Sequence, residues 1–215
     1  SGGSYTAAHF AASLHEHFFS RIAKSVTPLA LSQNKMLGEQ AVLLLSASGK
    51  NPDVLGAFNR AILSEPRRLI ILCFRRDSPL ARLAAKFDYV DLIEFDYPFG
   101  KDGFLATNSL LAFNTLLSRA YAEAASETAI FPATLEELLK PETSVENYSE
   151  QLKQQSLRIL ERRHLIVLHG VSTASAAIDL ESKFTEAALG TTQIADYRNF
   201  AHGRHHWLGK HAESS

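Results

Sequence analysis

The stretch Ala41-Val-Leu-Leu-Leu-Ser46-Ala-Ser-Gly-Lys-Asn51-Pro52 carries most of the information about the fold. It starts with a continuous apolar run, which is typical of a strand buried on both faces of a parallel sheet. Polar and small residues follow from Ser46 to Asn51, and a helical pattern extends from about Asp53 to Leu63. The order of strand, Ser/Gly loop and helix predicts one unit of an α/β fold.

The loop between this strand and this helix has the chemistry of an anion site. The first turn of a helix leaves backbone N–H groups unpaired and carries the positive end of the helix dipole. Ser46, Ser48 and Asn51 add side-chain donors, Gly49 permits close approach of a ligand, and Lys50 adds a positive charge. The alternative is an ordinary turn with good capping residues. The glycine spacings of the P-loop and of the dinucleotide fingerprint are absent.

Further strands and helices alternate on both sides of this stretch, which predicts a parallel sheet with helices on both faces. A first helix is expected from Tyr5 to Lys24 with Ser4 as its N-cap, followed by an extended segment from Val26 to Ser32. The later expected elements are a strand at Arg68–Phe74, a helix opening at Ser78-Pro79, a strand at Val90–Phe95 and a long helix at Phe104–Ala125.

The pattern restarts in the second half of the chain. Thr134 to Glu137 forms a capping box before a short helix, and a polar helix is expected from Val145 to Arg163. The expected elements after it are strands at His164–Leu168 and Thr191–Ala195 and helices at Ala176–Ala188 and Tyr197–Leu208. We therefore expect one α/β lobe over 1–125, a helical connector over 126–163 and the start of a second lobe over 164–215.

Composition excludes several classes of protein. The 215 residues carry a formal net charge of -1, which does not favour nucleic acid or an anionic membrane as partner. No apolar run approaches the roughly 20 residues that span a bilayer. The single cysteine, Cys73, lies inside an apolar strand, which favours a packing role and a cytoplasmic protein.

The loop and its flanks resemble the SIS (sugar isomerase) family. Ser46 to Asn51 is similar to the family's Ser-x-Ser-Gly-x-Thr segment, and Ser1 to Tyr5 is similar to its Gly-x-x-Ser loop. Ser78 to Ala81 resembles the segment after the family's third strand. Ala106 to Ser109 stands where the family has Ser-Thr-Lys. The resemblance implies a phosphate site that includes Ser4 and Thr107, in a lobe that lacks its first strand.

The second half resembles the start of a second SIS lobe, of the kind found in aminosugar-phosphate isomerases. Glu181 to Glu186 is similar to a Leu-Lys-x-Lys-Glu helix, and Asn199 to Arg204 to a following His-Gly-Pro turn. The resemblance implies that Glu186 is the base of an aldose–ketose isomerisation, His202 the ring-opening acid and Lys183 a stabiliser of negative charge. The alternative is a solvated helix face whose charges pair at i,i+3 and i,i+4 spacing.

Departures from the family keep two functions open. The loop has Lys50-Asn51 in place of Glu-Thr, and the catalytic tail has no counterpart, so a non-catalytic module that senses a sugar phosphate competes with an isomerase. A scaffold with a decayed site is a third alternative. The resemblance implies a homodimer without cofactor or metal. A metal site is the alternative for His202, His205 and His206, because histidine is a common metal ligand and these three are close in the sequence.

Overall fold

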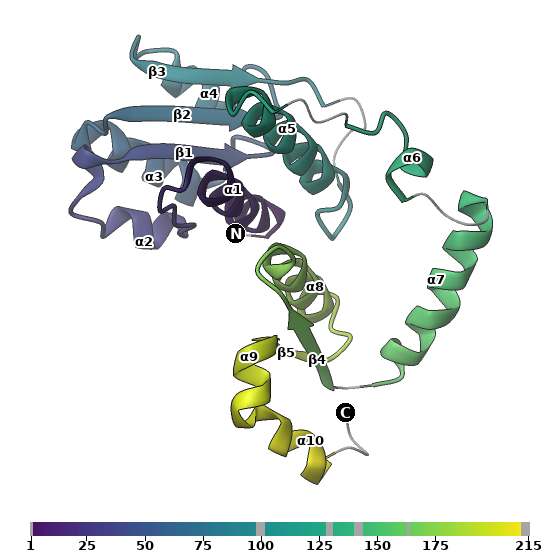
Figure 1. Cartoon of the computed structure of the whole chain (residues 1–215). Coiled ribbons are helices and arrows are strands. Elements are labelled where there is room, and N and C mark those ends of the chain that lie inside the picture. The colour runs from purple at the N-terminus through teal and green to yellow at the C-terminus, as the bar shows by residue number, and fades with distance from the viewer. Residues whose placement is uncertain (1, 98–101, 128–130, 140–143, 163, 212–215) are drawn as a thin grey trace. The chain divides into compact units, whose positions relative to one another are not determined.

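The computed structural model describes residues 2–97, 102–127, 131–139, 144–162 and 164–211, and these fall into two compact units, Ser1–Tyr121 and Ala122–Ser215. Both are built from parallel strands and helices (Figure 1). The predicted fold class, a parallel α/β architecture, is therefore confirmed.

The first unit, unit 1, contains a three-stranded parallel sheet in the order β1-β2-β3. Ala41 lies opposite Arg68, and Leu69 opposite Val90, in the register of the two ladders. The elements are α1 (Gly3–Phe19), α2 (Pro28–Ser32), η1 (Leu37–Glu39), β1 (Ala41–Ser46), α3 (Pro52–Ser64), β2 (Arg68–Cys73), α4 (Pro79–Ala84), β3 (Val90–Glu94) and α5 (Asn108–Ala124).

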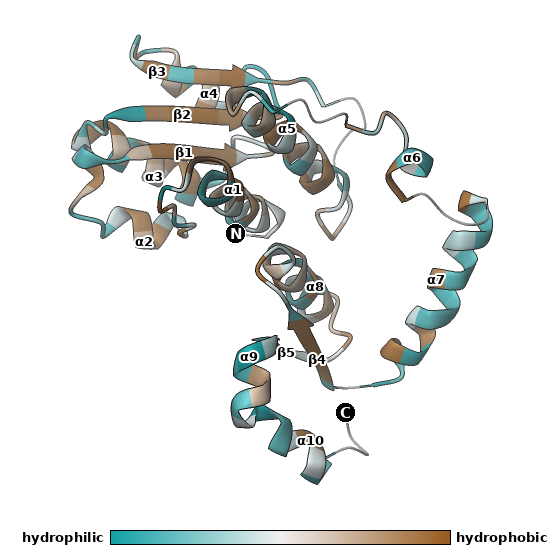
Figure 2. Ribbon diagram, viewed as in Figure 1, coloured by the Kyte–Doolittle hydropathy of each residue, from teal (hydrophilic) through white to brown (hydrophobic). Residues whose placement is uncertain are grey.

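Two apolar clusters sandwich this sheet, because successive side chains of a strand point to opposite faces. One cluster joins Leu44 and Ile71 to Phe58 of α3 and Leu80 of α4. The other joins Leu45, Leu72 and the residues after β2 to α1 and α5, where the rings of Phe74 and Phe113 stack with centroids 4.0 Å apart. The strands β1 and β2 are accordingly apolar over most of their length (Figure 2).

The second unit, unit 2, contains a two-stranded parallel sheet with His164 opposite Thr191. Helix α8 packs on both strands and buries Ala177 and Phe184. The elements are α6 (Leu135–Leu139), α7 (Val145–Leu160), β4 (His164–His169), α8 (Ala174–Glu186), β5 (Thr191–Asp196), α9 (Tyr197–Asn199), η2 (Phe200–Arg204) and α10 (His205–His211). Half of the predicted capping box forms, since Thr134 accepts a bond from the N–H of Glu137, whereas the Glu137 carboxylate accepts from the N–H of Ala133 rather than from that of Thr134.

Three local predictions in unit 1 are wrong. The N-cap of α1 is Gly2, with φ of 55°, so Ser4 lies inside the first turn of the helix rather than before it. Pro28 begins the helix α2 instead of continuing an extended segment, because Thr27 accepts a capping bond from the N–H of Ala30. The long helix begins at Asn108 rather than Phe104, since a residue upstream supplies its cap.

Candidate functional site

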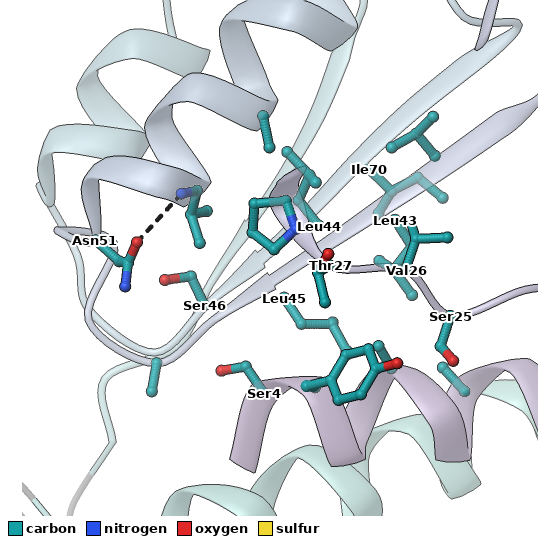
Figure 3. A pocket seen from close by; sticks show the side chains of 18 of the residues that line it. Ser4, Ser25, Val26, Thr27, Leu43, Leu44, Leu45, Ser46, Asn51 and Ile70 are labelled. Atoms are coloured by element: carbon teal, nitrogen blue, oxygen red, sulfur yellow. Dashed lines mark hydrogen bonds between the residues drawn. The ribbon is translucent and has the colours of Figure 1, made fainter. Parts of the chain in front are cut away.

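A cavity of about 1490 Å³ opens at the carboxyl end of β1 and contains most of the predicted phosphate site (Figure 3). Ser46 ends β1, Ser48, Lys50 and Asn51 come from the loop after it, and Ser4 comes from the first turn of α1. The carboxyl ends of parallel strands are the usual position of ligands in open α/β sheets. The structure thus brings five of the seven predicted phosphate-binding residues to one cavity.

The two serines of the loop use their oxygens to shape it. Ser46 Oγ accepts a hydrogen bond from the N–H of Gly49 at 3.0 Å, and Ser48 Oγ accepts one from the N–H of Lys50 at 3.3 Å. Each hydroxyl keeps its own proton, since a hydroxyl both donates and accepts. Both groups are therefore held in place by the loop and still have a donor for an anion.

Asn51 ends the loop as the N-cap of α3. Its Oδ1 accepts bonds from the N–H groups of Asp53 at 2.8 Å and Val54 at 3.4 Å, the second of which is drawn in Figure 3. The side-chain NH₂ group retains its two donors. Since α3 is 13 residues long, its positive end faces the loop with the full effect of a helix dipole.

The sequence suggests that Gly49 permits close approach of a ligand, but the structure shows that a glycine is required there by contacts within the protein. Its φ is +62°, and a Cβ at this position would lie 2.2 Å from Ser78 Oγ and 3.0 Å from Cys73 Sγ. The contact that excludes a side chain is thus the start of α4, not a ligand. Gly49 is buried and does not line the cavity, while Cys73 is fully buried beneath it, as its apolar strand predicts.

Three lysine and arginine residues border the cavity, and two of them, Lys50 and Arg75, lie near the carboxyl end of the sheet. Lys50 comes from the predicted loop, and Arg75 follows β2 at the same edge of the sheet. Within the described ranges neither of them forms an ion pair, whereas the neighbouring Arg76 pairs with Asp96 at 2.9 Å. Sequence reasoning did not assign Arg75 to the site, although its position directly after a parallel strand was an available signal.

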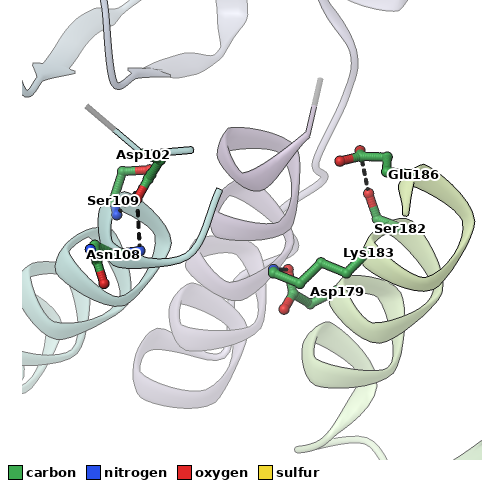
Figure 4. Close-up of polar contacts among 7 residues, drawn as sticks. All are labelled: Asp102, Asn108, Ser109, Asp179, Ser182, Lys183 and Glu186. Atoms are coloured by element: carbon green, nitrogen blue, oxygen red, sulfur yellow. Dashed lines mark hydrogen bonds and ion pairs between the residues drawn. The ribbon is translucent and has the colours of Figure 1, made fainter. Parts of the chain in front are cut away.

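The start of α5 already holds an anionic group, the carboxylate of Asp102. It accepts bonds from the N–H groups of Asn108 at 3.0 Å and Ser109 at 3.1 Å, and it is also bonded to Ser109 Oγ (Figure 4). Partial burial opposes ionisation, but the bonds from Ser109, Asn108 and Thr107 outweigh it and lower the pKa of Asp102. Thr107 does not line the cavity, so its predicted phosphate contact stays a prediction.

The predicted catalytic residues of α8 contact partners on their own helix. Lys183 forms an ion pair with Asp179, and Ser182 Oγ donates to Glu186 Oε1 at 2.8 Å (Figure 4). Both contacts have the i,i+4 spacing of a helix face. The side chains of Lys183 and Asp179 are 23% and 24% exposed, and Glu186 is exposed. These contacts are those expected of the alternative, a charge-paired helix face.

His202 lies in the other part of unit 2, where it lines a cavity of about 470 Å³ with Asp196, Arg198 and Asn199. His202, with φ of -83° and ψ of 20°, and Gly203, with φ of 132°, do not have helical backbone angles, so the helix is kinked at these two residues. No described residue of α8 lines this cavity, and the catalytic roles of Glu186, Lys183 and His202 therefore stay predictions.

The histidine run does not form a cluster of metal ligands. The rings of His205 and His206 lie 4.3 Å apart, and the ring of Trp207 stacks on that of His211. Among the residues that the structure describes, no group of three or more His, Cys, Asp and Glu side chains is arranged to hold a metal ion. None of the described helices is long and apolar enough to cross a bilayer.

Known structures share this fold. Glucosamine-6-phosphate deaminase from Thermotoga maritima superposes with a TM-score of 0.69 at 17% identity, over 94% of this chain and 61% of that one. The C-terminal domain of glucosamine-fructose-6-phosphate aminotransferase from Francisella tularensis gives 0.68 at 16% identity, over 97% and 60%. Tagatose-6-phosphate ketose/aldose isomerase from Escherichia coli gives 0.68 at 16% identity, over 95% and 56%.

These likenesses establish the fold class that the sequence resemblance predicts, the SIS-type α/β fold of phosphosugar isomerases and deaminases. The chain spans about three fifths of the length of the structures that it matches. No protein-family model and no curated protein matches the sequence significantly.

Proposed function

We propose that unit 1 binds a phosphorylated sugar, with the phosphate at the loop from Ser46 to Asn51. The observation that carries this proposal is the convergence of four polar side chains, those of Ser4, Ser46, Ser48 and Asn51, on one cavity at the start of α3. Hydroxyl and amide donors at a helix N-terminus are suited to a phosphate because its oxygens accept several hydrogen bonds at once.

The charges around the cavity support the same ligand. Lys50 and Arg75 supply positive charge at the mouth of the loop, and Asp102 is already engaged at α5. A ligand with one phosphate and a neutral polyol body fits this distribution, since a second anionic group near α5 would meet the Asp102 carboxylate. The solved structures with this fold include enzymes named for sugar 6-phosphates, in agreement with the proposal.

Isomerisation of the bound sugar is the second candidate function. It would use Glu186 to move a proton between adjacent carbons, His202 to open the ring and Lys183 to stabilise the developing charge. The intrahelical partners of Glu186 and Lys183, and the absence of α8 residues from the described lining of the His202 cavity, favour binding without turnover by this chain. A homodimer in the cytoplasm remains part of the proposal, because a second subunit can complete such a site.

The test is the melting temperature in a panel of hexose, hexosamine, pentose and heptose phosphates, with the free sugars as controls. A ligand that binds only the folded state raises the melting temperature by mass action. We expect a rise that requires the phosphate. The variants Ser46→Ala and Ser48→Ala each remove a donor to a charged group and should weaken binding by about tenfold or more.

The matched control is Ser13→Ala, because Ser13 is an exposed serine of α1 whose hydroxyl donates to the carbonyl of His9 and which does not line the cavity. Equal loss of affinity in Ser13→Ala and Ser48→Ala would contradict the assignment of the site. A panel without any phosphate-dependent shift would favour the scaffold alternative. Turnover of a ligand that binds, abolished in Glu186→Gln, would support the isomerase.

A further inference from the structure

The start of helix α5 is occupied by a carboxylate of the protein itself. Asp102 accepts bonds from the N–H groups of Asn108 and Ser109 and is also bonded to Ser109 Oγ (Figure 4). Donors of this kind, at the N-terminus of a helix of 17 residues, are those with which a helix binds an anion. Because Asp102 already uses them, they are not available to an acidic group of a ligand.

The start of helix α3 differs because its cap is neutral. Asn51 caps α3 with an amide oxygen, which adds no negative charge at the positive end of the helix. Its NH₂ group and the hydroxyls of Ser46 and Ser48 retain their donors. The same cavity is lined by both helix starts, one suited to an anion and one already closed by Asp102.

The first turn of α1 links the predicted phosphate contacts to the start of α5. Ser4 lies in this turn and lines the cavity. A Cβ added to the residue before it, Gly3, would lie 2.7 Å from Ala106 Cβ and 3.6 Å from Leu110 Cβ, so the two helix starts pack closely. Ser4 and the turn that Asp102 caps are therefore on neighbouring turns of two packed helices.

Asp102 also differs from the other carboxylates that line the cavity. Among the described residues these are Glu39, which precedes β1 at the opposite end of the strand from the loop, and Asp96, which pairs with Arg76 at 2.9 Å. Within the described ranges Asp102 forms no ion pair. It therefore supplies an uncompensated negative charge at the carboxyl end of the sheet.

The phenol of Tyr97 responds to this charge. Tyr97 lines the cavity beside Phe74, with the two ring centroids 5.8 Å apart. Burial raises the pKa of Tyr97, and the negative charge of Asp102 raises it further. The field of the carboxylate thus reaches other groups in this part of the cavity, and an acidic group of a ligand would meet the same field.

We infer that Asp102 is a specificity-determining residue, which excludes ligands with a second acidic group and selects sugar monophosphates whose other end carries hydroxyl groups. The inference rests on the proposed function, since it requires the phosphate at the loop from Ser46 to Asn51. A second acid would face a carboxylate whose donors are engaged, and such a like-charge contact weakens binding. A hydroxyl group can instead donate a hydrogen bond to the carboxylate.

A matched pair of ligands tests the inference. The pair is the alditol phosphate and the aldonate phosphate with the chain length of the tightest ligand in the melting panel. For a hexose phosphate these are sorbitol 6-phosphate and 6-phosphogluconate, which differ only in a terminal hydroxymethyl group or carboxylate. We expect titration calorimetry of the whole chain at neutral pH to show that the alditol phosphate binds about tenfold more tightly or more.

Removal of the charge should abolish this preference. In Asp102→Asn the ratio of the two dissociation constants should fall to about one or invert, because Lys50 and Arg75 attract the ligand of higher charge. Asp102→Ser also removes the charge and keeps an oxygen that can accept bonds from N–H groups, so it should change the ratio in the same direction. A purely structural role of Asp102 would weaken both ligands equally and leave the ratio unchanged.

The matched control is Asp96→Asn. Asp96 also lines the cavity, but it is exposed and its charge is paired with Arg76, so this variant should retain the wild-type ratio. A ratio that Asp96→Asn changes and Asp102→Asn does not would assign the selection to the end of β3 and overturn the inference.

Two further results would overturn the inference. One is equal binding of the two ligands by the wild-type chain, and the other is a ratio that both Asp102 variants leave unchanged. In either case, binding of the alditol phosphate that Ser48→Ala weakens and Ser13→Ala does not would retain the proposed function. A panel without any phosphate-dependent shift would instead reject the proposed function, and the role of Asp102 with it.

Discussion

Of the substitutions that add one methyl group to the loop, Gly49→Ala should lower the free energy of unfolding the most. The backbone at Gly49 has φ of +62°, and forcing an L-residue into the left-handed region costs about 1–2 kcal/mol. The added Cβ would lie 2.2 Å from Ser78 Oγ and 2.6 Å from Ser78 Cβ, so the start of α4 must shift. Overpacking of this kind costs about 1–3 kcal/mol, which gives about 2–5 kcal/mol in total.

A second substitution separates the two contributions. Ser78→Gly removes both atoms of the worst contact and, as a change of N-cap, costs only a few tenths of a kcal/mol by itself. In the double variant the steric part, about 1–3 kcal/mol, should be recovered while the backbone strain remains. The assay is urea unfolding of all four proteins of the cycle, followed by far-ultraviolet circular dichroism.

The control for this cycle is Gly56→Ala. Gly56 lies inside α3, and a Cβ added there would have no other atom within 4 Å, so alanine should stabilise the protein by about 0.5–1 kcal/mol. The reasoning would be refuted if the effects of Gly49→Ala and Ser78→Gly on the free energy of unfolding were strictly additive. Additivity would show that the new methyl group does not contact the side chain of Ser78.

Three further predictions concern other parts of unit 1. Phe113→Ala should lower the free energy of unfolding by about 3–5 kcal/mol in urea titrations, because the ring is 1% exposed and stacks on Phe74. Asn51→Ala should cost about 1 kcal/mol in the same assay through loss of the α3 cap, and it should also weaken phosphate binding in the melting assay. Asp102→Asn should reduce the loss of folding stability that occurs at acid pH. The pKa of Asp102 is lowered from its ordinary value of 3.8, so the ionised carboxylate stabilises the fold above that pH. This contribution is lost as the pH falls below that value.

Matched substitutions decide these predictions. Leu111 is 65% exposed on the same helix as Phe113, so a similar loss in Leu111→Ala would contradict the packing argument. Asn51→Ser should retain most of the stability, since serine is also a good N-cap. A wild-type chain and an Asp102→Asn variant with parallel stability curves between about pH 5 and pH 2.5 would show that Asp102 holds no anion-stabilising bonds.

The strands and loop of unit 1 could be predicted because local sequence determines them. A run of five apolar residues, a Ser/Gly loop and the pair Asn51-Pro52 act within a few residues of one another, and Asn51 caps the helix that this spacing predicts. The pair Ser78-Pro79 opens α4 in the same way. The fold class followed from the alternation of such units.

The features that sequence did not reveal depend on contacts between distant segments. Asp102 caps α5 from six residues upstream, across a turn without a recognisable motif, and so shortens the predicted helix. Arg75 joins the cavity only because β1 and β2 are parallel neighbours. Glu186 and His202 have a family-like spacing, but spacing along the chain does not determine the hydrogen-bond partners of a side chain. Glu186 accepts a bond from Ser182, which lies one turn earlier on the same helix.

The charged edge strand β3 limits how the sheet of unit 1 can pair with other sheets. A sheet with two open edges can polymerise without limit, because each added copy presents a new edge to the next. In the sheet of unit 1, Asp91 and Glu94 lie on the edge strand β3, with partners at Arg68 and Asp77, whereas the edge strand β1 carries no charge. Pairing through the edges of this sheet is therefore favoured on one side only, and such a sheet can gain a single neighbour without serving as the seed of a fibre.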